Sequence, residues 1–397
     1  MQLHNKLFKS LTLTVSLVLA PPAGATSYSV LALGNWFGGY STAYGINESG
    51  QIAGDAMTGA YSSIGFISGP DGVGTMGLGT LGGYQSNARG INLSGQVVGW
   101  AGTSSGDAHA FITGPNGMGM TDLGTLGGPN SSAISINDSG QVAGGAYINS
   151  TVIHAFITGP NGMGMTDLGT LGGVSSSATG INARGQVVGN SATGSGSGHA
   201  FITGPNGVGM NDLGTLGGAG SYARGINANG QVAGGAMILN GSTHAFLTGP
   251  NGTGMNDVGT LLGGGWSDAY GINTSGQVVG WGGSSTGVSH AFVTGVNGEG
   301  ITDLNDLASL QGDYFMWAGG INDQGQIIAQ SSSGQSYLLT PVPEPETFVL
   351  MLAGLGLVRY AARKKQKSQR KVETLDKESI SEAHCAEWRL NIRAQTT

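Results

Sequence analysis

The sequence predicts an all-β protein, a seven-bladed β-propeller built from four-stranded repeats of about 45 residues. Three observations predict this fold: one motif recurs seven times, each repeat contains four short strand patterns, and the two incomplete end repeats complement each other. The recurring motif is Gly-Ile-Asn-x-x-Gly-Gln or a close variant, and its asparagines are Asn47, Asn92, Asn137, Asn182, Asn227, Asn273 and Asn322. An open β-solenoid is the alternative architecture.

The repeat that begins at residue 176 illustrates the four strands. Glycine-containing turns separate segments of alternating or apolar character, which is typical of short antiparallel strands. The expected strands are residues 176–182, 186–190, 199–203 and 210–216, and the clearest turns are Asn182-Ala183-Arg184-Gly185 and Gly204-Pro205-Asn206-Gly207. Four strands in such a repeat match the size of one propeller blade.

The ends of the repeat array favour a ring over a solenoid. Residues 28–34 have the pattern of a fourth strand, whereas residues 336–340 have the pattern of a third strand that lacks its fourth. An open solenoid has no reason to end in complementary parts, but a ring can complete one shared blade from both ends and protect its edges. We therefore expect the N-terminal and C-terminal strands to close the propeller within residues 26–341.

Histidine and aspartate occur together in five repeats. The His of each His-Ala-Phe tripeptide precedes, by thirteen residues, the Asp of an Asp-Leu-Gly-like segment. The pairs are His109 and Asp122, His154 and Asp167, His199 and Asp212, His244 and Asp257, and His290 and Asp303. The two other repeats lack both residues, with Ile64 and Gly77 in one and Ser336 and Ala32 in the other.

This joint occurrence predicts a contact across the hairpin of the third and fourth strands, with the carboxylate accepting a hydrogen bond from imidazole. We expect a repeated structural pair rather than a ring of metal or catalytic sites, since catalytic sites are few per protein. No calcium-loop or phosphate-loop spacing occurs, so neither a metal nor a cofactor is predicted.

Residues 1–25 predict a secretory signal peptide. Lys6 and Lys9 precede a short apolar run, residues 11–20, and the small residues Ala23 and Ala25 suit cleavage before Thr26. A membrane anchor is the alternative, but the run is too short to span about 30 Å as a helix. The segment predicts the Sec translocon and signal peptidase as partners.

The C-terminal region contains a second sorting pattern. Pro343-Glu344-Pro345 is followed by an apolar run, residues 347–358, and then by the basic residues Arg359, Arg363, Lys364, Lys365 and Lys367. This order resembles the PEP-CTERM sorting signal of Gram-negative bacteria that make exopolysaccharide, and we assign residues 342–367 to it.

The resemblance implies transient inner-membrane anchoring by a transmembrane helix through residues 347–358, cleavage by an exosortase, and residence in the cell envelope, at the cell surface or in the extracellular matrix. Such chains usually stop soon after the basic cluster. Residues 368–397 instead form a polar tail that we expect to be discarded or disordered.

The repeated sequence motifs of residues 26–341 resemble the HAF repeats of extracellular bacterial proteins, which are named for the His-Ala-Phe tripeptide. That resemblance implies an exported protein but brings no established activity. Residues 26–341 contain three basic and fifteen acidic residues, a formal charge of −12. Such a body, without a basic stripe, argues against binding nucleic acid or an anionic membrane surface.

Two functional hypotheses follow. The first is a non-enzymatic matrix protein, either structural or binding extracellular polysaccharide, with tryptophans that break the repeat pattern as stacking residues: Trp100, Trp266 and Trp281, together with Trp36 and Trp317. Packing between blades is the alternative role of these rings. The second is a secreted polysaccharide-active glycosidase or lyase, whose carboxylate pair would come from the non-repeated acids Asp55, Asp107, Asp268, Asp306 and Asp313.

Overall fold

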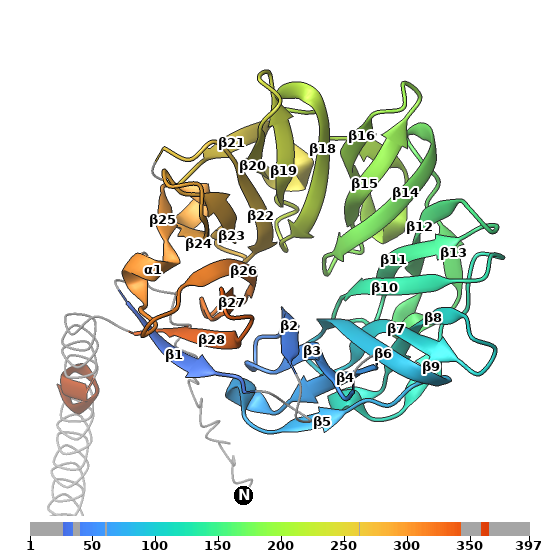
Figure 1. The fold of residues 1–397 in the computed structure, drawn as a ribbon, viewed down its shortest axis with the longest axis horizontal. Helices are drawn as coiled ribbons and strands as arrows, with labels where there is room; N and C mark the ends of the chain where they lie inside the picture. Colours follow the sequence, from blue (N-terminus) through green and yellow to red (C-terminus); the bar gives the residue numbers. More distant parts are fainter. Residues whose placement is uncertain (1–26, 35–39, 60–61, 262, 343–358, 365–397) are drawn as a thin grey trace, which may run out of the picture. The chain divides into compact units, whose positions relative to one another are not determined.

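The computed structural model describes residues 27–34, 40–59, 62–261, 263–342 and 359–364. Within residues 27–342, seven four-stranded antiparallel sheets surround a common centre, which confirms the predicted seven-bladed β-propeller (Figure 1). Residues 343–397 form a separate unit, of which the described residues, 359–364, are helical.

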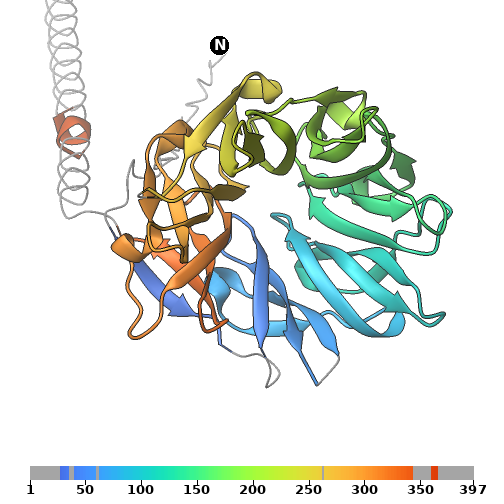
Figure 2. The same ribbon diagram turned by 45° about the horizontal axis from the view of Figure 1, so that its top comes forward.

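The first strand of each blade lies at the centre of the ring, and the second strand pairs with its outer side (Figure 2). The first strands of blades 1 to 7 are β2 (Ser41–Ile46), β6 (Gly82–Ile91), β10 (Ser131–Ile136), β14 (Gly172–Ile181), β18 (Gly217–Ile226), β22 (Ser267–Ile272) and β26 (Phe315–Ile321). The second strands are β3 (Ile52–Met57), β7 (Val97–Thr103), β11 (Val142–Tyr147), β15 (Val187–Thr193), β19 (Val232–Ile238), β23 (Val278–Gly283) and β27 (Ile327–Ser331).

The third and fourth strands form the outer half of each blade. The third strands are β4 (Ser63–Ser68), β8 (Ala108–Thr113), β12 (Ile153–Thr158), β16 (Gly198–Thr203), β20 (Thr243–Thr248), β24 (Ser289–Thr294) and β28 (Ser336–Pro341). The fourth strands are β5 (Thr75–Gly77), β9 (Met120–Asp122), β13 (Met165–Asp167), β17 (Met210–Asp212), β21 (Met255–Gly259), β25 (Ile301–Asp303) and, in blade 7, β1 (Tyr28–Ala32).

Short helical turns connect the third and fourth strands of blades 1 to 6. They are η2 (Pro70–Gly72), η3 (Pro115–Gly117), η4 (Pro160–Gly162), η5 (Pro205–Gly207), η6 (Pro250–Gly252) and η7 (Val296–Gly298). The central residue of each turn has a positive φ of 52° to 54°, which suits the Asn found in five of them and the Asp of η2. A short helix, α1 (Leu304–Leu307), follows β25.

The observed strands of blade 4 differ from the predicted ones only in where they begin and end. In blade 4 the fourth strand ends at Asp212 instead of residue 216, because Gly214 adopts a φ of +74° and turns the chain. The first strand is longer than predicted and begins at Gly172.

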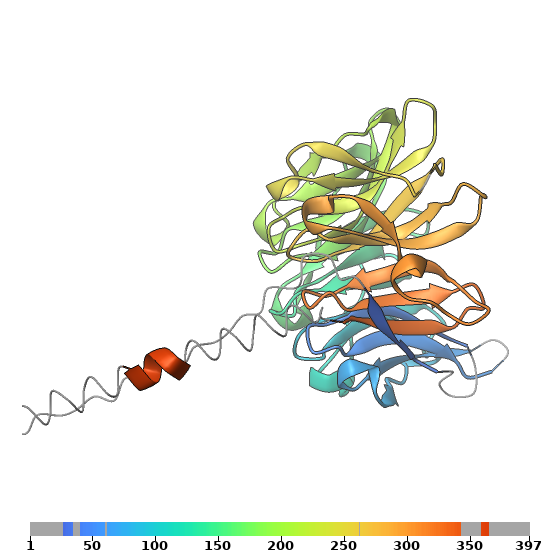
Figure 3. The ribbon, with the colours of Figure 1, turned by 90° about the vertical axis from the view of Figure 1, so that its left-hand side faces the viewer.

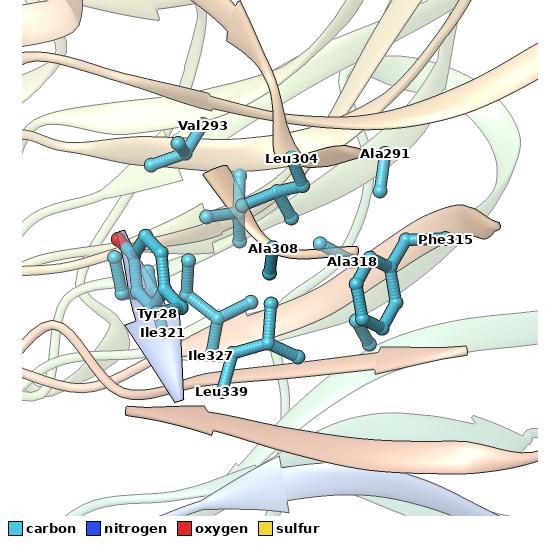
Figure 4. Close-up of a cluster of buried hydrophobic side chains, with 12 residues drawn as sticks. Tyr28, Ala291, Val293, Leu304, Ala308, Phe315, Ala318, Ile321, Ile327 and Leu339 are labelled. Atoms are coloured by element: carbon cyan, nitrogen blue, oxygen red, sulfur yellow. The ribbon is translucent and has the colours of Figure 1, made fainter. Parts of the chain in front are cut away.

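Strand β1 closes the ring by pairing with β28, as the sequence predicts. The pairing is antiparallel, with Tyr28 opposite Pro341 and Leu31 opposite Leu338, and the dark blue β1 lies beside β28 in both views (Figures 1 and 3). A buried cluster that includes Tyr28, Phe315 and Leu339 packs blade 7 against blade 6 (Figure 4). The open solenoid is therefore excluded.

The apolar core lies between neighbouring blades rather than within one sheet. Phe156 of blade 3, for example, clusters with Val98 and Ala110 of blade 2. The phenylalanines at this position, two residues after each paired histidine or its equivalent, are fully buried: Phe66, Phe111, Phe156, Phe201, Phe246 and Phe292. Each blade is thus stabilised by the blade before it.

The asparagines of the recurring motif form a closed ring of hydrogen bonds around the centre. Each Asn Nδ2 donates to the backbone carbonyl of the next motif asparagine at 2.9 to 3.3 Å, and Asn322 donates to Asn47, so the circle is complete. Within each repeat, Asn Oδ1 accepts from the backbone N–H of the motif Gln, for example from Gln186 to Asn182 at 3.1 Å. The motif is therefore explained by contacts within and between blades.

Candidate functional site

The structure brings each predicted His and Asp together. In blade 4, Asp212 lies opposite Phe201 and reaches diagonally to His199, whose Nδ1 is 2.8 Å from Asp212 Oδ2. The corresponding distances in the other four pairs are 2.6 to 2.8 Å. The second oxygen of Asp212 accepts from the backbone N–H of Gly214 at 2.7 Å, so the carboxylate also holds the turn after β17.

A structural role for these pairs stays a prediction. Within the described ranges, no three His, Cys, Asp or Glu side chains are grouped as metal ligands.

The predicted histidine position of blade 7 needs one correction: Tyr337 lies opposite Ala32, as Phe201 lies opposite Asp212, so Gln335 and not Ser336 occupies that position. The sequence-based alignment was wrong by one residue because blade 7 has Gln335-Ser336-Tyr337 where the other blades have His-Ala-Phe or a similar tripeptide.

A central cavity of about 690 Å³ is lined by the inner strands of all seven blades. One residue per blade, three positions before the motif asparagine, contributes to its wall: Tyr44, Arg89, Ile134, Thr179, Arg224, Tyr270 and Gly319. The isoleucine that precedes each asparagine separates this cavity from a second hollow of about 240 Å³ at the asparagine ring.

A β-bulge places these wall residues in the cavity. In each blade the register between the first and second strands shifts at this residue, for example between Ala43 and Gly45 around Tyr44, and between Ala88 and Gly90 around Arg89. The same shift occurs in blades 3 to 7. A bulge leaves one residue outside the strand alternation and redirects its side chain.

Five side chains form a polar and aromatic crescent along one side of the cavity, which we call the crescent: Arg224, Tyr270, Trp317, Tyr44 and Arg89 of blades 5, 6, 7, 1 and 2. The guanidinium of Arg224 lies 4.5 Å from the Tyr270 ring centroid, and that of Arg89 lies 4.2 Å from the Tyr44 centroid. The Tyr270 and Trp317 rings are 5.7 Å apart. Ile134 and Thr179 of blades 3 and 4 form the opposite wall.

Two carboxyl groups lie behind the crescent. Asp268 is 6% exposed, and its Oδ2 lies 3.7 Å from Arg224 Nη2. Burial raises the pKa of Asp268 to about 6 and outweighs the lowering by the Arg224 charge. Asp55 accepts a hydrogen bond from Asn87 Nδ2 at 2.8 Å, and burial raises its pKa against the lowering by the Tyr44 hydroxyl and Arg89.

Unpartnered buried polar atoms concentrate in the same place. Across the described part of the chain, four buried side-chain atoms lack a hydrogen-bond partner: Asn87 Oδ1, Arg224 Nε, Asp268 Oδ1 and Trp281 Nε1. Arg224 and Trp281 line the cavity, while Asn87 and Asp268 lie behind its wall. Tyr222, Trp281 and Arg224 nevertheless lie close enough to Asp268 to lower the pKa of its carboxyl group, so these atoms belong to one loosely aligned polar cluster beside the cavity.

The tryptophans selected from the sequence occupy different environments. Trp281 lines the cavity, and Trp266 packs edge-on against it with centroids 4.8 Å apart. Trp100 is half-buried on β7 opposite Asn87 and is not part of the cavity wall. Trp317 lines the cavity and donates from Nε1 to Gln330 Oε1 at 2.6 Å, whereas Trp36 lies outside the described residues.

Sequence reasoning missed the arginines and tyrosines of the crescent. Two of the three arginines of the repeat body, Arg89 and Arg224, meet at one cavity, while Arg184 lies in the turn after the Asn182 motif. The other non-repeated acids lie elsewhere: Asp107 in the β7–β8 connection, Asp306 in α1, and Asp313 before β26. The repeats carry different residues at three positions: five and three residues before the motif asparagine, and eight residues after it. This variation is the sequence signal that could have identified the cavity wall.

Comparison with known protein families identifies the C-terminal sorting signal. The PEP-CTERM protein-sorting motif matches residues 341–365, which implies export to the cell envelope or surface and sorting by an exosortase. Arg359, Arg363 and Lys364 lie in the described helical segment, whereas Pro343, Glu344, Pro345, Lys365 and the expected anchoring run 347–358 lie outside the described residues. Among the helices that can be described, none combines the length and hydropathy that crossing a bilayer requires.

Several solved structures are similar to this chain, at low sequence identity to it. TolB from Acinetobacter baumannii is 12% identical, with a TM-score of 0.44. The similarity covers 77% of this chain and 64% of the TolB chain, which is less than two thirds of the length of TolB. YCF48 bound to D1 peptide is 12% identical, with 82% and 99% covered and a TM-score of 0.46.

A gluconolactonase, XC5397 from Xanthomonas campestris, is 10% identical, with 81% and 92% covered and a TM-score of 0.40. Similarity of this degree says nothing about what this chain binds. No curated protein matches the sequence.

Proposed function

We propose that this protein is an exported, non-enzymatic component of an extracellular matrix that binds exopolysaccharide through its central cavity. One observation carries the proposal. The repeats diverge at three positions that would be equivalent in a purely structural array, and in blades 1, 2, 5, 6 and 7 these positions supply the crescent and the carboxyl groups behind it. Aromatic rings beside polar groups are a common means of holding sugar rings.

The sorting signal supports the matrix setting. A chain that is released by an exosortase reaches the outside of the cell, where polysaccharide is the abundant polymer of a matrix-forming bacterium. The repeats fit the HAF class, since the tripeptide itself supplies both the paired histidine and the buried phenylalanine of five blades. A Gram-negative host, a Sec-dependent signal in residues 1–25 and a transient inner-membrane stage through residues 347–358 complete this proposal.

Titration of the mature protein with polysaccharide from its own host tests the proposal. Trp281 and Trp317 line the cavity, so binding there changes the tryptophan emission of the protein. We expect a saturable change that Ile134→Trp, which places a larger ring in the cavity from its far wall, strongly weakens. Absence of any response up to millimolar sugar concentration would rule out polysaccharide binding.

A polysaccharide-active glycosidase or lyase is the second candidate, and one observation favours it: Asp268 has a raised pKa beside the same cavity. Glycosidases use two carboxyl groups that flank the scissile bond. Here Asp268 of blade 6 interacts with Arg224, and Asp55 of blade 1 interacts with Arg89. Each carboxyl group therefore belongs to its own arginine pair instead of facing the other carboxyl group. We expect no new reducing or unsaturated ends after prolonged incubation; such ends, if lost in Asp268→Asn, would establish the enzyme instead.

A further inference from the structure

We propose that the central cavity selects an uncharged stretch of glycan over an acidic one. This inference rests on the proposed function and deepens it, because it names the ligand class of the same cavity. Its basis is the charge balance of the wall, the aromatic character of the crescent, and the negative charge of the propeller.

The two arginines of the crescent are each balanced by a carboxyl group. Arg224 lies beside Asp268, and Arg89 interacts electrostatically with Asp55. Among the described residues that line the cavity, Arg89 and Arg224 are the only Lys, Arg, Asp or Glu, and their two carboxyl partners lie behind the wall. A uronate, sulfate or phosphate group would therefore enter a site without net positive charge, on a body whose formal charge is −12 between residues 26 and 341.

The guanidinium groups are also placed differently from those of a typical anion site. Arg89 stacks over Tyr44, and Arg224 lies between the Tyr222 and Tyr270 rings at 5.0 and 4.5 Å from their centroids. Cation–π contacts of this kind hold the side chains flat against the wall. The arginines thus stiffen the tyrosines of the crescent instead of forming a fork around a free anion.

The remaining wall suits the faces of sugar rings. Tyr44, Tyr270, Trp281 and Trp317 provide aromatic surface, and the rest consists mainly of isoleucine and glycine. Two lining residues, Arg224 and Trp281, carry N–H donors beside the Asp268 carboxyl group behind the wall, so polar groups accompany the aromatic surface. The volume of about 690 Å³ lies within the range typical of small-molecule sites, about 300 to 1,000 Å³.

A matched pair of probes tests the inference on the mature protein. Isothermal titration with neutral tetrasaccharides of glucose, mannose and galactose is compared with titration of tetragalacturonic acid at the same ionic strength. We expect at least one neutral probe to bind ten-fold or more tightly than the acidic probe. Trp317→Ala and Ile134→Trp, on opposite walls, should each weaken that binding at least ten-fold, whereas His199→Ala on the periphery should leave it unchanged.

A charge variant gives the complementary result. Asp268→Asn removes the carboxyl that balances Arg224, so affinity for tetragalacturonic acid should rise several-fold, while Asp107→Asn, far from the cavity, should have no such effect. The inference is overturned if wild-type protein prefers the acidic probe, if no neutral probe binds, or if both cavity variants fold and bind normally. When the host polysaccharide still binds in either of the first two cases, and the cavity variants weaken that binding, the proposed function stands and only the ligand class is wrong. Normal binding of the host polysaccharide by both folded cavity variants would refute the cavity as the binding site and, with it, the proposed function.

Discussion

Replacing Asp268 by Asn should change how the stability of the propeller depends on pH. The carboxyl group is 6% exposed, and its pKa in the folded protein is about 6 against an ordinary value of 3.8. Between pH 4 and 6 the folded state therefore binds more protons at this site than the unfolded state. Stability from this group is highest at low pH and is lost as the pH rises through 6.

The size of the effect follows from the shift. Two pKa units correspond to about 3 kcal/mol, which is the amount of stability that ionised Asp268 removes at neutral pH. For a propeller of about 310 residues that unfolds as one unit, this equals about 4 to 5 °C in melting temperature. The variant also loses the attraction to Arg224, so the change between two pH values is more informative than the stability at either.

Differential scanning calorimetry at pH 4.5 and pH 7.5 provides the measurement. At pH 4.5 the unfolded carboxyl is already mostly ionised, so about 2 of the 3 kcal/mol separates the two pH values. Relative to wild type, Asp268→Asn should therefore gain about 3 °C more at pH 7.5 than at pH 4.5. Asp107→Asn, a half-exposed acid between β7 and β8, is the matched control and should show no such difference. An identical pH response of wild type and Asp268→Asn would refute the reasoning that burial dominates at this site.

Three further substitutions test the repeated architecture, each by chemical denaturation. Asn182→Ala should cost about 2 to 4 kcal/mol, because it removes the amide bonded to the Asn227 carbonyl and leaves buried backbone groups unpaired; a loss below 1 kcal/mol would contradict the role of the asparagine ring. His199→Ala should lower stability, and a double-mutant cycle with Asp212→Ala should give a coupling of about 1 kcal/mol or less, as the pair is half-exposed; zero coupling would count against the pair. Phe201→Ala should cost about 3 to 5 kcal/mol, and a near-neutral result would show that the inter-blade core can collapse around the missing ring.

The ring itself could be predicted because its signals are local in sequence. The strand pattern of residues 28–34 and that of residues 336–340 are visible without knowledge of their partner, and only a closed ring lets each of the two incomplete repeats complete the other. The His and Asp contact was equally accessible, since a hairpin brings residues at a fixed spacing together. The prediction of the histidine position in blade 7 was wrong because Gln335-Ser336-Tyr337 contains none of the residues of the His-Ala-Phe tripeptide.

The cavity could not be predicted by the same means. Strand alternation places neighbouring residues on opposite faces, but Tyr44, Arg89, Arg224 and Tyr270 lie at bulges, where alternation fails. Their convergence also depends on five blades meeting around one centre. Nothing in the local sequence of Arg89 indicates that Arg224, 135 positions later in the chain, shares its cavity.

The pairing of β1 with β28 has a consequence for the order of folding. Translation produces residues 28–32 before the rest of the propeller, and their strand partner, residues 336–341, after the whole intervening body. Six blades can assemble as their hairpins emerge, but the seventh must wait, and the sorting motif that begins at residue 341 follows immediately. A chain truncated anywhere before β28 would thus leave the edges of β1 and β27 unpaired, so closure of the ring depends on the last strand of the propeller to be synthesised.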